Sequence, residues 1–232
     1  MFRLNRAVVA PVLAEFVGTG VLVMVALILG QTTAVSYFIA TSLAVAAAII
    51  YLLFSGVSGA HTNPAVTFGL WTARRIGTLR GISYIAAQLL GGAAAWQLFQ
   101  YLTNHAVNSK TVAFSTPLWL AEVVGTAVLA LAFTAALNRG VETLNSAVAV
   151  GGAYFTGILI AATASAGYIN PAIALGSRAW SSVYVLGPLV GGLIGANLYA
   201  YFFSTVAPVR AGGGAVTVKR TSVTRRTTTR RR

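Results

Sequence analysis

Apolar residues occur along this chain in long runs that short polar segments separate. Six runs are about 20 residues or longer, which is the length an α-helix needs to cross the hydrocarbon core of a bilayer. We expect spanning helices at about 7–30, 35–54, 81–102, 117–137, 144–164 and 183–203. The pattern therefore predicts an all-α membrane protein with six transmembrane helices.

Two shorter apolar segments follow the second and the fifth span. Each begins with an Asn-Pro-Ala motif, Asn63-Pro64-Ala65 in the first and Asn170-Pro171-Ala172 in the second. Asn is a favoured N-cap, and Pro fits the first helical turn because its missing N–H would have no partner there. The segments end near Trp71 and Ala179, so each helix is roughly 15 Å long, half the hydrocarbon thickness. We expect two re-entrant half-helices.

The two halves of the chain are related by an internal repeat. Asn63 and Asn170 lie 107 residues apart, and so do Glu15 and Glu122, each of which opens a Glu-x-x-Gly-Thr box. Two motifs in one register indicate a duplication. We place the repeats at about 7–103 and 117–204, within a channel domain of residues 1–206. Three spans per repeat is an odd number, so we expect the second repeat to be inverted.

Composition agrees with a membrane protein and excludes most enzyme classes. Hydrophobic residues make up 57% of the chain and charged residues 8%, with a mean hydropathy of +0.79. A soluble domain carries about a quarter charged residues. The chain has no Cys, and its only acids are Glu15, Glu122 and Glu142. Without thiols or clustered carboxylates, we expect no enzyme activity, no cofactor and no metal ion.

The net charge of +13 is concentrated at one side of the predicted membrane domain. With both termini on that side, only Lys110 and Arg178 of the 16 basic residues lie on the other. The positive-inside rule then places both termini in the cytoplasm. The basic tail 207–232 contains no Leu, Ile, Met or aromatic residue, and we expect it to be disordered. Anionic headgroups could bind it, whereas nucleic acid is not expected, because no aromatic residues alternate with its arginines.

Inverted repeats bring the two Asn-capped helix ends together from opposite faces of the membrane. The approaches, residues 55–62 and 165–169, are non-helical backbone at membrane depth, which survives only when buried or lining a wet cavity. Positive helix ends and the amides of Asn63 and Asn170 face the centre. This arrangement predicts a pore that favours water and small neutral solutes over ions and protons.

These motifs, together with Ser58-Gly59-Ala60-His61 before the first Asn-Pro-Ala, resemble the aquaporin or major intrinsic protein family over about residues 7–204. The resemblance implies an aquaporin-like fold with one pore per protomer, a homotetramer in the cell membrane, and passive solute flow. It also implies that Glu15, Glu122 and His61 brace the half-helix loops. The alternatives are a proton-coupling role for the two carboxylates and a ligand or gating role for His61.

The chain departs from the family at the predicted selectivity filter. Ile173 occupies the position where the family usually has Arg, and by alignment the other filter positions are Gly167, Ile158 and either Leu43 or Val45. Such an apolar constriction has two competing consequences. It could admit glycerol, ammonia or hydrogen peroxide, or it could dewet and slow the passage of water.

Two nearby residues refine this expectation. Arg178 follows Ile173 by five positions, about 140° around a helix, and is a poor substitute for the missing arginine. Ala174 stands where glycerol facilitators usually have Asp, which favours a channel other than a dedicated glycerol facilitator. The other function classes are an ion- or proton-coupled secondary transporter with inverted repeats and a structural membrane protein with a closed pore.

Overall fold

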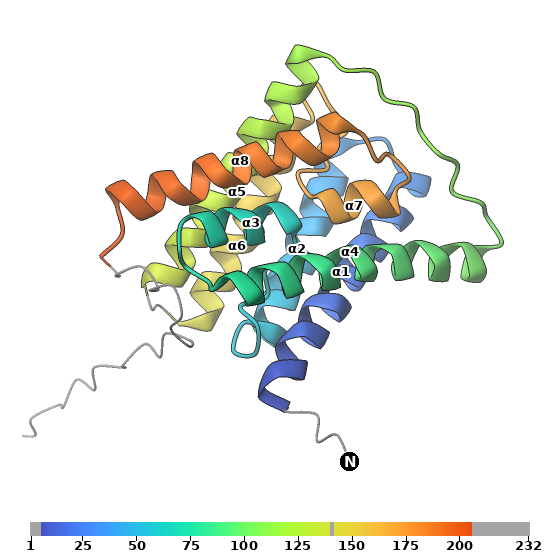
Figure 1. Ribbon diagram of the computed structural model, residues 1–232. Helices are drawn as coiled ribbons and strands as arrows, with labels where there is room; N and C mark the ends of the chain where they lie inside the picture. The colour runs from blue at the N-terminus through green and yellow to red at the C-terminus, as the bar shows by residue number, and fades with distance from the viewer. Residues whose placement is uncertain (1–5, 140–141, 206–232) are drawn as a thin grey trace, which may run out of the picture.

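The computed structural model describes residues 6–139 and 142–205, and these residues form eight helices and no strand (Figure 1). The six long helices are α1 (Arg6–Thr32), α2 (Ser36–Phe54), α4 (Thr78–Thr103), α5 (Thr116–Arg139), α6 (Thr143–Ala161) and α8 (Ser182–Phe202). The two short helices are α3 (Pro64–Thr72) and α7 (Pro171–Gly176). The predicted all-α class is confirmed, and the bounds of the six predicted spans agree to within a few residues.

Five of the long helices in the described part of the chain are long and apolar enough to cross a membrane. The sixth, α4, has 26 residues but is less apolar, because Gln88, Gln97 and Gln100 interrupt it. Large apolar side chains lie exposed along the outer faces of the bundle, among them Leu53, Leu90, Val148 and Leu186. Contiguous exposed apolar surface of this kind marks a membrane-embedded protein.

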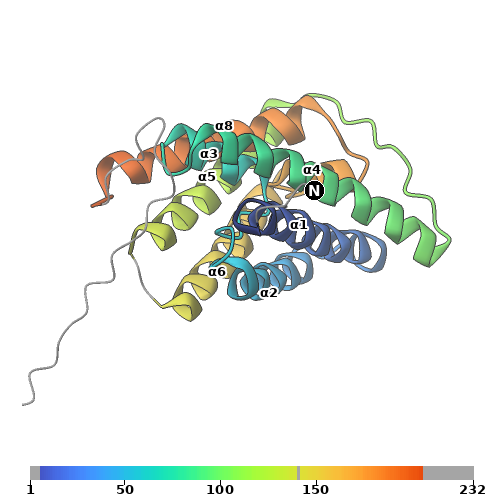
Figure 2. The same cartoon turned by 60° about the horizontal axis from the view of Figure 1, so that its bottom comes forward.

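The two halves of the chain interlock. Within each half, the first long helix packs against the last, α1 on α4 and α5 on α8, while α2 packs on α6 across the halves. Each half-helix lies against the last helix of the opposite half, α3 along α8 and α7 along α4 (Figures 1 and 2). Neither half therefore buries its half-helix without the other.

Paired glycines set the distances between these helices. Gly91 on α4 and Gly191 on α8 are so close to α1 and α5 that an added Cβ would overlap a facing backbone carbonyl. A Cβ on the next residues would overlap the backbone of a half-helix, α7 in the case of Gly92 and α3 in the case of Gly192. Small residues allow close helix approach where lipid provides no hydrophobic driving force. One glycine of each pair thus contacts a spanning helix, and the other contacts a half-helix.

The second half-helix is shorter than the sequence pattern predicts. It ends at Gly176 rather than near Ala179, because Arg178 adopts a left-handed conformation with φ of 57°. The N–H of Ala179 then bonds to the carbonyl of Ala174 at 2.9 Å, which closes the helix end. Arg74 ends α3 in the same way, with φ of 55°. Both half-helices therefore finish at an arginine in the left-handed region.

Candidate functional site

The N-terminal ends of α3 and α7 are capped by the two asparagines of the Asn-Pro-Ala motifs. Asn63 Oδ1 accepts a hydrogen bond from the N–H of Ala65 at 2.8 Å. Asn170 Oδ1 accepts from the N–H of Ala172 at 2.9 Å. Pro64 and Pro171 occupy the first helical turn of their half-helices. Each motif therefore starts a helix by the same side-chain cap.

The other end of each asparagine side chain contacts the opposite loop. Asn63 Nδ2 donates to the carbonyl of Ile169 at 2.9 Å, and Asn170 Nδ2 donates to the carbonyl of Thr62 at 3.0 Å. These bonds bring the two helix ends together in the buried centre of the bundle. A primary amide has two N–H donors, so each asparagine retains one donor beyond this cross-link.

The loops that lead into the two motifs follow the same unusual backbone path. Ala60 and Thr62 have φ of 50° and 45°, and the residues 107 positions later, Gly167 and Ile169, have φ of 66° and 43°. A residue with a side chain rarely adopts positive φ, and each such residue costs roughly 1–3 kcal/mol. The surrounding structure must therefore hold both loops in place.

Glu15 holds the first loop from behind. One carboxylate oxygen accepts from Ser58 Oγ at 2.6 Å and from the N–H of His61 at 2.9 Å. The other accepts from the N–H of Thr62 at 2.7 Å and from Gln88 Nε2 at 2.8 Å. The Glu15 side chain is fully buried, and all four of these partners are hydrogen-bond donors.

Glu122 holds the second loop with the equivalent contacts. It accepts from Ser165 Oγ at 2.6 Å, from the N–H of Tyr168 at 3.1 Å and from the N–H of Ile169 at 2.7 Å. The three partners lie 43, 46 and 47 residues after the glutamate, the same separations as in the first half. The internal repeat is thus preserved as a hydrogen-bond pattern.

His61 is enclosed in the bundle beside the first loop. Its ring meets the rings of Tyr84 and Phe133 edge-on, with centroids 5.4 and 5.8 Å away. Its Nδ1 lies 3.2 Å from Thr67 Oγ1, which also accepts a hydrogen bond from Gln88 Nε2 at 2.7 Å. These contacts place His61 in the same polar network as Glu15.

Two tyrosines that the sequence reasoning missed also hold the loops. Tyr84 on α4 donates its hydroxyl to the carbonyl of Ser58 at 3.0 Å. Tyr184 on α8 accepts at its hydroxyl from the N–H of Ala166 at 3.1 Å. The two tyrosines lie 100 residues apart, as do the glycine pairs on the same helices. This second shift in the repeat was the signal in the sequence that could have found them.

Four of the five predicted filter residues lie in the interior of the bundle. Leu43, Ile158 and Ile173 belong to one buried apolar cluster, and a Cβ added to Gly167 would lie 3.1 Å from the carbonyl oxygen of Ile158. Val45 is the exception, with a side chain that is 55% exposed on the outer face, whereas Leu43 is 3% exposed. Of the two alternatives on α2, only Leu43 is buried in the core of the bundle.

The candidate for a replacement arginine, Arg178, packs on an aromatic side chain. The guanidinium carbon of Arg178 lies 4.4 Å from the ring centroid of Trp96 on α4, which is cation–π geometry. Lys110, in the loop between α4 and α5, donates to the Tyr168 hydroxyl at 3.2 Å. The guanidinium of Arg178 therefore already has an aromatic partner on α4.

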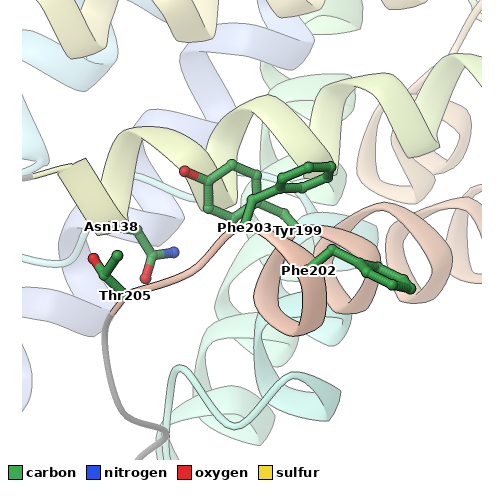
Figure 3. A pocket seen from close by; sticks show the side chains of 5 residues that line it. All are labelled: Asn138, Tyr199, Phe202, Phe203 and Thr205. Carbon is green, nitrogen blue, oxygen red and sulfur yellow. The ribbon is translucent and has the colours of Figure 1, made fainter.

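Other kinds of site are less well supported by the geometry. Among the residues that the structure describes, no group of three or more His, Cys, Asp or Glu side chains could hold a metal ion. A cavity of about 650 Å³ lies between the ends of α5 and α8, lined by Asn138, Tyr199, Phe202, Phe203 and Thr205 (Figure 3). None of these residues belongs to either Asn-Pro-Ala motif or its loop, so the cavity is separate from the site.

Spanning helices around two half-helices that meet at their capped ends define a membrane channel protein. The Major intrinsic protein family model matches residues 4–199. The chain belongs to the major intrinsic protein family, whose members are passive channels rather than enzymes.

Proteins similar to this chain occur in a plant, an archaeon and a protozoan parasite. Aquaporin TIP2-3 of Zea mays is 32% identical over 89% of this chain and 93% of its own length. Aquaporin AqpM of Methanothermobacter marburgensis is 33% identical over 68% of this chain and 73% of its own length. The X-ray structure of the aquaglyceroporin from Plasmodium falciparum matches 85% of this chain and 96% of its own with a TM-score of 0.66, at 24% identity. This structural likeness confirms the aquaporin-like fold.

Proposed function

We propose that the protein conducts water through a pore that passes the meeting point of α3 and α7, and that it excludes ions and protons there. The observation that carries this proposal is the reciprocal contact of Asn63 and Asn170 with the opposite loop. It brings two helix N-termini and two partly free amides to one buried point. The relatives named as aquaporins support water as the main solute.

The electrostatics of this point favour neutral molecules. The asparagine caps already bond the N–H groups of Ala65, Val66 and Ala172. The donors left for a solute are therefore the spare N–H groups of the two asparagines. Water or another small neutral solute can accept from them. A cation or excess proton meets the positive ends of two helices, and the asparagine N–H groups cannot replace the acceptors of its hydration shell.

Because the filter is apolar, ions must be excluded by the two asparagines of the Asn-Pro-Ala motifs. Leu43, Ile158 and Ile173 provide neither a fixed charge nor a side-chain donor, and Arg178 is engaged with Trp96. Cation rejection therefore rests on Asn63 and Asn170 rather than on an arginine in the filter. Small neutral solutes such as glycerol, ammonia and hydrogen peroxide are the further candidates for passage.

The buried carboxylates support a bracing role rather than proton coupling. Glu15 receives four hydrogen bonds and Glu122 three, and every partner donates. A carboxylate that only accepts hydrogen bonds is matched to its ionised form. If either carboxylate were protonated, its O–H would face another donor and a hydrogen bond to the loop would be lost. A transport cycle that protonates Glu15 or Glu122 would therefore disrupt its loop.

Topology and assembly belong to the same proposal. Both termini face the cytoplasm, which the distribution of 16 basic residues supports, and the protein works in the cell membrane as a homotetramer with one pore per protomer. The basic tail 207–232 lies outside the described residues. Native mass spectrometry of the purified protein tests the tetramer, and protease access to the tail in sealed cells tests the topology.

Stopped-flow light scattering on proteoliposomes tests the solute. We expect fast shrinkage with an impermeant osmolyte, at a rate proportional to the amount of reconstituted protein. Fast shrinkage followed by slow re-swelling in glycerol means that water passes selectively, whereas rapid re-swelling means that glycerol passes too. Shrinkage no faster than that of empty liposomes would contradict the proposal and favour a closed pore.

A further inference from the structure

Tyr154, near the middle of α6, has an unpartnered hydroxyl in the centre of the bundle. Its side chain is only 1% exposed, and no hydrogen-bond partner for the hydroxyl lies within the described residues. The polar side chains near the hydroxyl include those of Asn63, Thr62 and Asn170. They are near enough to interact with it, but none has hydrogen-bond geometry. The hydroxyl thus faces the point where the two half-helices meet.

A buried hydroxyl without a partner is unfavourable, and most such groups are satisfied by protein or water. Here the unsatisfied group lies beside two asparagines that each retain a free N–H donor. A small polar molecule at this point could accept from an amide and donate to the tyrosine oxygen. A solute molecule at this point would therefore supply the partner that the tyrosine hydroxyl lacks.

The surroundings of Tyr154 indicate that its ring borders the solute path. Tyr154 lies one helical turn before Ile158, about 6 Å along the same face of α6, and both belong to the buried cluster that contains Leu43 and Ile173. The equivalent residue in the first repeat, 107 positions earlier, is Ala47. The large aromatic side chain is therefore present on one side of the meeting point only.

We propose that Tyr154 is a specificity-determining residue that contacts the permeating molecule between the two Asn-Pro-Ala motifs. This inference rests on the proposed channel function. The spare N–H groups of Asn63 and Asn170 can only donate, whereas a phenolic hydroxyl can also accept. Together they select a molecule that donates and accepts at the same time, and the ring limits its size. Water satisfies both conditions.

Tyr154→Phe tests the hydroxyl, because it removes one oxygen and keeps the ring. We expect the loss of one hydrogen bond to the solute to lower water permeability per protein about fivefold and to steepen its temperature dependence. Tyr199→Phe on α8 is the matched control, since Tyr199 is also buried but lines the cavity between the ends of α5 and α8. We expect the control to conduct like the wild type. Equal water permeability in Tyr154→Phe and the wild type would overturn the inference while leaving the channel function intact.

Tyr154→Leu tests the ring by a gain of function that misfolding cannot mimic. Removing the aromatic bulk widens the path, so we expect glycerol permeability to rise severalfold relative to water. Glycerol permeability unchanged from the wild type would mean that Tyr154 does not border the path. If the wild type itself shows no water flux above empty liposomes, both the channel function and this inference fail, which distinguishes that result from failure of the inference alone.

Discussion

Asn63 and Asn170 are linked through each other's loops. Each side chain caps its own half-helix through Oδ1 and donates through Nδ2 to the carbonyl that precedes the other asparagine, at 2.9 and 3.0 Å. One residue type therefore starts both helices, joins them and leaves one donor free. Because a carboxylate has no donor, no acidic replacement can fill all three roles.

Replacing either asparagine by aspartate should weaken ion exclusion. Asn63→Asp or Asn170→Asp keeps the oxygen that caps the helix, but it replaces the cross-link donor by a second acceptor and adds negative charge. We expect cation conductance to rise above that of the wild type in patch or flux measurements on reconstituted protein. Asn145→Asp, at an exposed position of α6, is the control and should leave conductance unchanged. Wild-type conductance in both motif variants would show that the asparagines do not reject cations.

Replacing a bracing glutamate by glutamine should destabilise the fold. In Glu15→Gln and Glu122→Gln, the side-chain NH₂ faces a hydroxyl or backbone donor, so at least one charge-assisted hydrogen bond is lost. We expect the free energy of unfolding to decrease by about 2 kcal/mol or more, visible as a lower melting temperature in detergent. Glu142→Gln changes the remaining acid, which is exposed, and should melt like the wild type. Thermal stability equal to the wild type in both bracing variants would contradict the role.

Restoring the family's arginine should narrow the range of solutes. Ile173→Arg places a cation and five donors in the apolar cluster of Leu43, Ile158 and Ile173. We expect the ratio of glycerol to water permeability to fall, measured by stopped-flow light scattering on the same liposomes. Ile173→Leu keeps the site apolar and should preserve the ratio. A ratio that the arginine leaves unchanged would mean that Ile173 does not line the constriction.

A matched pair on α2 tests which residue lines the filter. Leu43→Phe enlarges a side chain inside the apolar cluster, whereas Val45→Phe enlarges one that is 55% exposed on the outer face. We expect Leu43→Phe to reduce water permeability per protein and Val45→Phe to leave it unchanged. The reverse order would place Val45, not Leu43, on the solute path.

Two glycines test the packing of the helices. A Cβ on Gly191 would overlap the backbone of α5, whereas a Cβ on Gly152 would meet no atom within 4 Å. Gly191→Ala should therefore cost about 1–3 kcal/mol of stability, the usual range for overpacking, and Gly152→Ala should cost nothing. Thermal melting of the purified variants measures both. Equal melting temperatures would show that α8 can move away from α5 without loss.

The helices and the site's general position could be predicted because each depends on local chemistry. Apolar run length determines the spans, and Asn followed by Pro determines where each half-helix begins. The early end of α7 could not be predicted, since it depends on Arg178 adopting a left-handed conformation. In the same way, no pattern along α2 could decide between Leu43 and Val45, because the choice depends on how the helix is rotated against α6.

The role of Tyr154 could not be predicted from the local sequence pattern. An aromatic residue within an apolar span is usually part of the core, and nothing local marks its hydroxyl as unpartnered. Comparison of the two repeats would have shown the difference between Tyr154 and Ala47. Tyr84 and Tyr184 were missed for another reason, since they follow the 100-residue shift of α4 and α8 rather than the 107-residue shift of the motifs.

The central claim is that the meeting point of the two half-helices passes water and rejects ions. It is tested most directly by recording osmotic shrinkage and proton leak, with an enclosed pH-sensitive dye, on one batch of wild-type proteoliposomes. We expect water flux that increases with the protein-to-lipid ratio, while proton leak stays at the level of empty liposomes. A proton leak that increases with the protein, or water flux that does not, would contradict the account.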